Sequence, residues 1–276
     1  MSRMKFAICN EIFRGWTIED TFAYASRLGY DATEIAPFTL ANSVTDVSSS
    51  ERQKIRDAAT RHHIAIAGLH WLLVKPDGLY INHPDHAIRG RTAQYLRQLV
   101  EFCADLGGTR MVIGSPKQRD LLPGVSLEQA RDWTAQTLRD ALAAAEQRDV
   151  VLCFEPLAPF ETNFINTAAE AIEFTKQFQS PNFKIILDVK ALCSEAKPIP
   201  QIIRESWPNF AHFHANDKNL KGPGFGEVDF KPIAAALKEV GYDGYVSVEV
   251  FNFDEGPEVI ASRSLEYLRE VFSIPS

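Results

Sequence analysis

Short apolar runs alternate with longer amphipathic segments from one end of this chain to the other. The runs have the length of buried strands, and the segments between them repeat apolar residues at helical spacing. The eight predicted strands are residues 6–9, 32–35, 64–68, 111–113, 151–154, 183–187, 210–213 and 245–248. Strict alternation of strand and helix favours a parallel sheet, and eight such units favour an α/β fold closed into a single (β/α)8 barrel, the TIM barrel. We therefore expect one domain over residues 1–276.

The segments between the strands carry recognisable helix signals. Thr17 with Asp20, and Ser126 with Gln129, are N-cap residues followed three positions later by a reciprocal partner. Residues 192–209 contain three prolines, which predicts a short helix that begins late. The sequence after the first strand, CNEIFRGW, lacks the glycine-rich phosphate loop of an open dinucleotide-binding sheet.

Composition excludes several partners and compartments. The chain has 29 basic and 36 acidic side chains and a net charge of −7, so it has no electrostatic footprint for nucleic acid or anionic membranes. No run approaches the ~18 apolar residues of a membrane span, and the N-terminus has no signal-peptide pattern. The four cysteines are far apart and form no CxxC pair, which favours buried thiols in a reducing compartment. We expect a soluble cytoplasmic protein.

Four polar residues follow four consecutive apolar strands: Glu155, Asp188, His214 and Glu249. The carboxyl ends of barrel strands meet at one mouth, where such barrels build their active sites. Three carboxylates and one imidazole form a mostly hard ligand set, suited to Mn²⁺ or Mg²⁺ and tolerant of Co²⁺. A single acidic residue in such a place is often a helix cap or ion-pair partner. Four of them on successive strands predict one divalent metal ion.

Side-chain alternation along the strands provides a geometric check. If Glu249 points into the barrel, Ser247 does too, while Val248 faces the helices. By the same rule His214 shares its side with His212. The outward set is apolar, as packing against helices requires.

The stretches CFEPLAPFETNFINTAAEA, IILDVK, HFHANDKNLKGPGFGEVDF and ALKEVGYDGYVSVEVF resemble the xylose isomerase-like TIM barrels. Within that family they are most similar to the sugar isomerases and epimerases that include the ketose 3-epimerases. The resemblance extends over essentially the whole chain and is strongest over residues 151–251. It implies that Glu155, Asp188, His214 and Glu249 bind one divalent metal ion, with Mn²⁺ the first expectation.

The resemblance also implies a mechanism for these residues. A metal that chelates a carbonyl and its neighbouring hydroxyl acidifies the adjacent C–H and stabilises the enediolate formed when the proton leaves. Glu155 and Glu249 match the two catalytic glutamates of the family, where one removes the proton and the other returns it on the opposite face. Two opposed bases make an epimerase, whereas one base suffices for an aldose–ketose isomerase. Glu161, in PFETN, matches a substrate-binding position.

Two family positions that hold the substrate differ in this chain. The histidine three residues after the metal aspartate is Ala191, and the arginine six residues after the metal histidine is Leu220. These departures put the family's best-known substrates in doubt without affecting the metal. Other groups can compensate, and each also has an ordinary structural explanation as a rim, loop or hydrogen-bonded residue. The candidate substrate contacts are His70, Lys117 with Arg119, Asn216, and Trp16 with Phe38.

Three further functions are weighed against the isomerase. A lyase or hydratase would use the same enolisation on a 3-keto-glycoside and end in elimination or hydration. A nuclease of the same barrel family needs extra histidine ligands that are missing here, and a non-catalytic binding module leaves the two opposed glutamates unexplained. We expect a small-molecule sugar as partner, neither nucleic acid nor membrane, and by analogy a homodimer or homotetramer.

Overall fold

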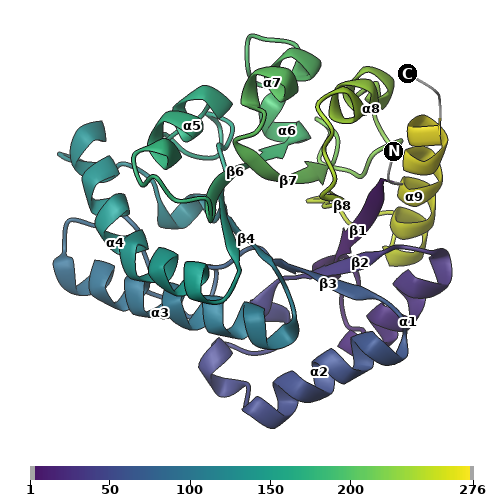
Figure 1. Cartoon of the computed structure of the whole chain (residues 1–276), viewed down its shortest axis with the longest axis horizontal. Helices are drawn as coiled ribbons and strands as arrows, with labels where there is room; N and C mark the ends of the chain where they lie inside the picture. The colour runs from purple at the N-terminus through teal and green to yellow at the C-terminus, as the bar shows by residue number, and fades with distance from the viewer. Residues whose placement is uncertain (1–3, 274–276) are drawn as a thin grey trace.

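A computed structural model describes residues 4–273 and confirms the predicted barrel (Figure 1). Eight parallel strands close in sequence order, with β8 paired to β1. The strands are β1 (Lys5–Cys9), β2 (Ala32–Ile35), β3 (Ala65–Leu69), β4 (Arg110–Ile113), β5 (Val151–Phe154), β6 (Phe183–Asp188), β7 (Phe210–Ala215) and β8 (Tyr245–Val248). Each predicted strand is present within one or two residues at either end. The predicted domain, 1–276, includes residues 1–3 and 274–276, which lie outside the described part.

The helices form an outer ring around the strands in Figure 1. They are α1 (Ile18–Leu28), α2 (Ser49–Arg61), α3 (His86–Leu106), α4 (Leu127–Gln147), α5 (Ala168–Lys176), α6 (Val189–Leu192), α7 (Ile199–Ser206), α8 (Phe230–Glu239) and α9 (Pro257–Ser273). Short 3-10 turns follow the strands at η1 (Asn10–Ile12), η2 (Pro37–Thr39), η3 (Val44–Asp46) and η4 (Pro116–Gln118). The proline-rich segment 192–209 forms one short helix, α7, which begins late as expected, and the single turn α6 precedes it. None of the helices within residues 4–273 has both the length and the apolar character to cross a membrane.

The predicted caps form at the helix starts. The side chain of Thr17 accepts a hydrogen bond from the backbone N–H of Asp20. Ser126 and Gln129 form the complete reciprocal box at the start of α4. At its C-terminal end, helix α3 stops at Gly107, which has a φ of 85°, a left-handed conformation that glycine adopts without steric cost.

The core has two layers, one outside the barrel and one inside it. The outer layer packs Val246 and Val248 of β8, with the apolar faces of the helices, into one large cluster. The inner layer is narrow and includes Val112, Cys153 and Ile186. Towards the carboxyl ends of the strands the interior becomes polar, so the fold itself delivers charged groups to one mouth.

Candidate metal and substrate site

The structure brings the four strand-end residues together. Glu155 directly follows β5, Asp188 is the last residue of β6, His214 lies in β7, and Glu249 directly follows β8. Each offers a ligand atom, and these atoms all lie within 4.8 Å of one another. The imidazole Nδ1 of His214 lies 3.0 Å from Glu249 Oε2 and 3.9 Å from Asp188 Oδ2. All four side chains are buried.

The electrostatics of this cluster fit a bound cation. Burial, together with the nearby Asp188 and Glu249, raises the pKa of Glu155 to about 8. Burial also raises the pKa of Asp188. His214 Nδ1 and Glu249 Oε2 lie 3.0 Å apart without the geometry of a hydrogen bond, so within residues 4–273 neither of these buried atoms has a hydrogen-bond partner. A divalent ion would offset the crowded negative charge and give both atoms a partner, so the residues present fit a metal.

Glu34, which sequence reasoning missed, supports the cluster from below. It lies in β2, is fully buried, and accepts hydrogen bonds from His212 Nε2 at 2.9 Å, His214 Nε2 at 3.1 Å and Ser247 Oγ at 2.7 Å. The bond through Nε2 leaves Nδ1 of His214 directed at the other ligands. A carboxylate that fixes a ligating imidazole in this way sets its orientation. The available signal was a charged residue within the predicted strand 32–35.

Asp188 is also held on both sides. Its Oδ1 accepts the backbone N–H of Ala191 at 2.8 Å, and its Oδ2 accepts the Nδ2 group of Asn216 at 2.6 Å. Asn216 is fully buried, and its Oδ1 accepts the backbone N–H of Lys190. The amide of Asn216, a predicted substrate contact, is therefore engaged in orienting Asp188.

Lys190 is a second residue that sequence reasoning missed. Its Nζ lies 2.5 Å from Glu161 Oε1 and 3.7 Å from the centroid of the Phe251 ring. Lys190, Glu161, Glu155 and Glu249 line one small cleft of about 20 Å³. The predicted contact Glu161 thus faces the cluster with an ammonium group beside it. A lysine two residues after a strand-end aspartate was the only sequence signal.

His70 lies between two carboxylates. Its Nε2 is 2.8 Å from Glu11 Oε2, and its Nδ1 is 3.2 Å from Glu249 Oε1. Burial by itself would lower the pKa of His70, but Glu11 and Glu249 outweigh it and raise that pKa to about 10. Burial would likewise raise the pKa of Glu249, but His214 and His70 hold it below its ordinary value. His70 therefore orients Glu249 rather than standing free at the rim.

Lys117 and Arg119 lie differently from what the sequence suggested. Lys117 is exposed on η4 and is absent from the described residues that line the mouth cavities. Arg119 is buried, and its guanidinium donates to the backbone oxygens of Glu155 at 2.7 Å and Phe164 at 2.9 Å. Carbonyl oxygens thus occupy the terminal nitrogens of Arg119, while its buried Nε has no hydrogen-bond partner within residues 4–273.

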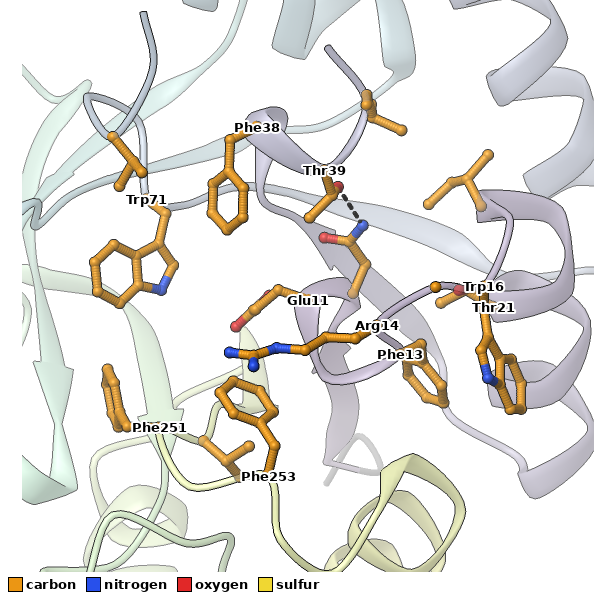
Figure 2. A pocket seen from close by; sticks show the side chains of 16 residues that line it. Glu11, Phe13, Arg14, Trp16, Thr21, Phe38, Thr39, Trp71, Phe251 and Phe253 are labelled. Carbon is orange, nitrogen blue, oxygen red and sulfur yellow. Dashed lines mark hydrogen bonds between the residues drawn. The ribbon is translucent and has the colours of Figure 1, made fainter. Parts of the chain in front are cut away.

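A larger cavity of about 560 Å³ opens beside the cluster, over the ends of β1, β2, β3 and β8 (Figure 2). Its aromatic walls include Trp16, Phe38, Trp71, Phe251 and Phe253. Trp71 and Phe251 also line the small cleft at the cluster. Trp16 and Phe38 both line this cavity, and the Trp16 ring also packs against Phe13 and Tyr24, at 5.3 Å between ring centroids in each case. Their contact with a substrate stays a prediction.

Comparison with known proteins agrees with this geometry. Residues 22–271 match the family model of the xylose isomerase-like TIM barrels. The D-psicose 3-epimerase of Ruminiclostridium cellulolyticum is 34% identical over 46% of this chain and 44% of that protein, so this match spans less than half of the relative. The L-ribulose 3-epimerase of Mesorhizobium japonicum is 30% identical over 67% of this chain and 62% of that protein.

Two further likenesses cover nearly the full length. The 3-dehydro-D-guloside 4-epimerase of Escherichia coli is 24% identical over 96% of this chain and 99% of that protein. Among solved structures, the D-psicose 3-epimerase of Clostridium cellulolyticum H10 with D-tagatose has a TM-score of 0.86. It is 22% identical over 98% of this chain and 99% of that one, a likeness that shows the fold.

Proposed function

The chain belongs to the xylose isomerase-like TIM barrel family, and on that premise we propose that it is a divalent-metal-dependent epimerase of keto sugars. The observation that carries the proposal is the pair Glu155 and Glu249, which belong to one potential metal cluster and line one cleft. The relatives described above are epimerases of D-psicose, L-ribulose and a 3-dehydro-D-guloside, which supports a sugar as the substrate class.

Glu155, Asp188, His214 and Glu249 would hold the metal. The set has three carboxylates and one imidazole and no thiolate, which favours Mn²⁺, with Mg²⁺ and Co²⁺ as alternatives. When bound, the ion supplies positive charge that polarises a carbonyl and acidifies the neighbouring C–H.

The side chains of this protein perform the proton transfer in the proposal. One of Glu155 and Glu249 accepts the proton from the carbon beside the carbonyl, and the other returns a proton to the opposite face. His70 keeps Glu249 in position through the 3.2 Å contact. The ammonium of Lys190, fixed by Glu161, provides a cationic donor beside the reacting oxygens in place of the family histidine that is Ala191 here.

The experiment is hydrogen exchange in deuterated water. Purified protein with Mn²⁺ is incubated with D-psicose, L-ribulose and a methyl 3-keto-glucoside, and NMR follows both exchange beside the carbonyl and the epimer formed. We expect Glu155→Gln and Glu249→Gln each to lower the exchange rate by about 10² to 10⁴. Glu266→Gln, an exposed matched control on α9, should leave it unchanged. Full activity in either of the first two variants would falsify the mechanism.

A further inference from the structure

The larger cavity at the barrel mouth exceeds what the reacting centre requires. Its volume of about 560 Å³ falls within the roughly 300 to 1,000 Å³ typical of sites for drug-sized ligands. The cleft beside Glu155 and Glu249 measures about 20 Å³. Since Trp71 and Phe251 line both spaces, a molecule that reacts in the small cleft can extend directly into the large one.

The walls of this cavity suit a flat ring. Figure 2 shows Phe38, Trp71, Phe251 and Phe253 arranged around its open centre. Trp71 and Phe251 meet edge to face at 6.1 Å between ring centroids. Trp71 has a φ of 52°, a left-handed conformation that is costly for a bulky residue. Aromatic walls of this kind stack against other aromatic rings and against the apolar faces of sugars.

The polar groups of the cavity decide between those two kinds of ring. Asn10 and Thr39 are already paired, because Asn10 Nδ2 donates to Thr39 Oγ1 at 2.7 Å and Asn10 Oδ1 accepts the N–H of Ala36 at 2.8 Å. Glu11 differs: its Oε2 contacts His70, while its Oε1 is buried and has no hydrogen-bond partner within residues 4–273. Glu11 is among the residues that line the cavity, so a ligand hydroxyl that reaches this oxygen would give a buried acceptor the donor that it lacks.

Arg14 is the other charged group in view, and it lies at the rim. Its guanidinium carbon is 3.8 Å from the centroid of the Phe253 ring, and the side chain is exposed. Figure 2 also shows the indole nitrogen of Trp71 facing the open centre, so the polar side-chain groups in view are this donor, the rim cation Arg14 and the acceptor Glu11 Oε1. A second sugar unit would bring more hydroxyls than these groups can pair, and unpaired hydroxyls are costly to bury. An aromatic ring with one hydroxyl group matches the lining better.

We propose that this cavity is a subsite for the non-reacting part of the substrate, an aromatic ring whose hydroxyl donates to Glu11 Oε1. The inference rests on the proposed function and names its substrate class: a keto sugar joined to an aryl aglycone rather than a free ketose. The sugar carbonyl lies at Glu155 and Glu249, and the aglycone lies between the aromatic walls. The different residues at Ala191 and Leu220 agree with this, since the second ring supplies binding energy that the family histidine and arginine otherwise provide.

Substrate selectivity tests the subsite. The Mn²⁺-loaded enzyme is given 3-keto-glucosides with methyl, 4-hydroxyphenyl and 4-methoxyphenyl aglycones, a 3-keto-disaccharide, and free D-psicose. We expect kcat/KM for the 4-hydroxyphenyl compound to exceed that for the methyl compound by at least about tenfold, and methylation of the hydroxyl to remove part of that gain. Phe38→Ala should lower the aryl-to-methyl ratio about fivefold to tenfold. Leu127→Ala, an exposed apolar residue at the start of α4, should leave the ratio unchanged.

A binding measurement separates failure of the subsite from failure of the proposed function. Calorimetric titration with unoxidised 4-hydroxyphenyl β-D-glucoside, which cannot be enolised, should give a Kd at least about tenfold below that of methyl β-D-glucoside. If none of the keto sugars exchanges hydrogen but this preference is present, the proposed function fails and the subsite stands. Equal values for aryl and methyl compounds overturn the subsite while exchange continues. A preference for the disaccharide replaces the aryl occupant with a glycosyl one. A Phe38→Ala variant that changes the oligomeric mass but not the selectivity identifies the cavity as a subunit contact.

Discussion

Two lysine–glutamate pairs in this protein have the same N–O distance and opposite surroundings. Lys190 and Glu161 are 2.5 Å apart with side chains 3% and 13% exposed, whereas Lys197 and Glu205 are 2.5 Å apart with side chains 53% and 46% exposed. Removing one member of a buried pair leaves an uncompensated charge, while an exposed partner is readily solvated. The two pairs therefore share their residue types and N–O distance and differ in burial.

We expect Lys190→Met to lower the free energy of unfolding by about 3 kcal/mol or more in metal-free protein. Lys197→Met should lower it by less than about 1 kcal/mol. Urea unfolding followed by circular dichroism measures both. The double variant Lys190→Met/Glu161→Gln should recover part of the loss, because the orphaned carboxylate is gone. Equal losses in the two single variants would contradict the assigned importance of burial.

Gly114 offers a way to disturb one ligand without disturbing the fold. A Cβ at this position would overlap Oε2 of Glu155, the free end of a side chain that can move. We expect Gly114→Ala to weaken Mn²⁺ binding and lower the exchange rate at least about tenfold while the unfolding midpoint changes little. Gly90→Ala on helix α3 is the matched control, since nothing lies within 4 Å of the position that its methyl carbon would take. Wild-type metal affinity in Gly114→Ala would show that Glu155 is not a ligand.

Single residues differ in how far the sequence exposes their roles. Glu155 and Glu249 could be identified from the sequence because each follows an apolar strand, where polarity changes abruptly. Glu34 was hidden, since one charged residue in a four-residue strand does not show which distant side chains it meets. It bonds His212 and His214, which lie 178 and 180 positions along the chain, and only barrel closure brings them together. The role of Lys190 was hidden as well, because its partner Glu161 lies 29 positions away in the chain and only the fold brings the two together.

At the scale of elements, the periodic patterns were sufficient for the strands and the capped helices. A strand buried on both faces must be apolar, and a helix start needs a side chain to accept its free N–H groups. The conformations of the loops after β4 and β5 could not be predicted from such patterns. The sequence made Lys117 and Arg119 candidate substrate contacts, but Arg119 turns inward to backbone oxygens, and nothing in the local sequence indicates this.

Arg119 joins these two loops, so its loss should be a folding defect. We expect Arg119→Met to lower the free energy of unfolding by about 3 kcal/mol or more, because the carbonyls of Glu155 and Phe164 lose their donor in a buried place. Arg139→Met, an exposed change on α4, should have little effect. Thermal unfolding and substrate kinetics are compared for both. A raised KM at unchanged stability would instead restore a substrate role for Arg119.

At the scale of the whole molecule, barrel closure gathers one ligand from each of four consecutive strands. The family resemblance seen in the sequence is confirmed over residues 22–271. The sequence indicated less about the substrate, because the cavity walls come from the loops after β1, β2, β3 and β8. These loops lie side by side only because the barrel closes. The same closure implies that an ion held by Glu155, Asp188, His214 and Glu249 ties together strands from the second half of the chain.

A metal ion that binds only the closed barrel should therefore stabilise the entire fold. At a free Mn²⁺ concentration 100 times its Kd, linkage predicts about 2.7 kcal/mol of added stability. For a chain of this size that corresponds to a rise in Tm of roughly 5–10 °C over protein kept in EDTA. Differential scanning calorimetry measures the shift across a Mn²⁺ series, with Mg²⁺ and Co²⁺ in parallel. Asp188→Asn keeps the side-chain shape but removes a ligand charge, so its Tm should respond much less to the same series. A Tm that is unaffected by all three metals in the unmodified protein would remove the metal from the proposed mechanism.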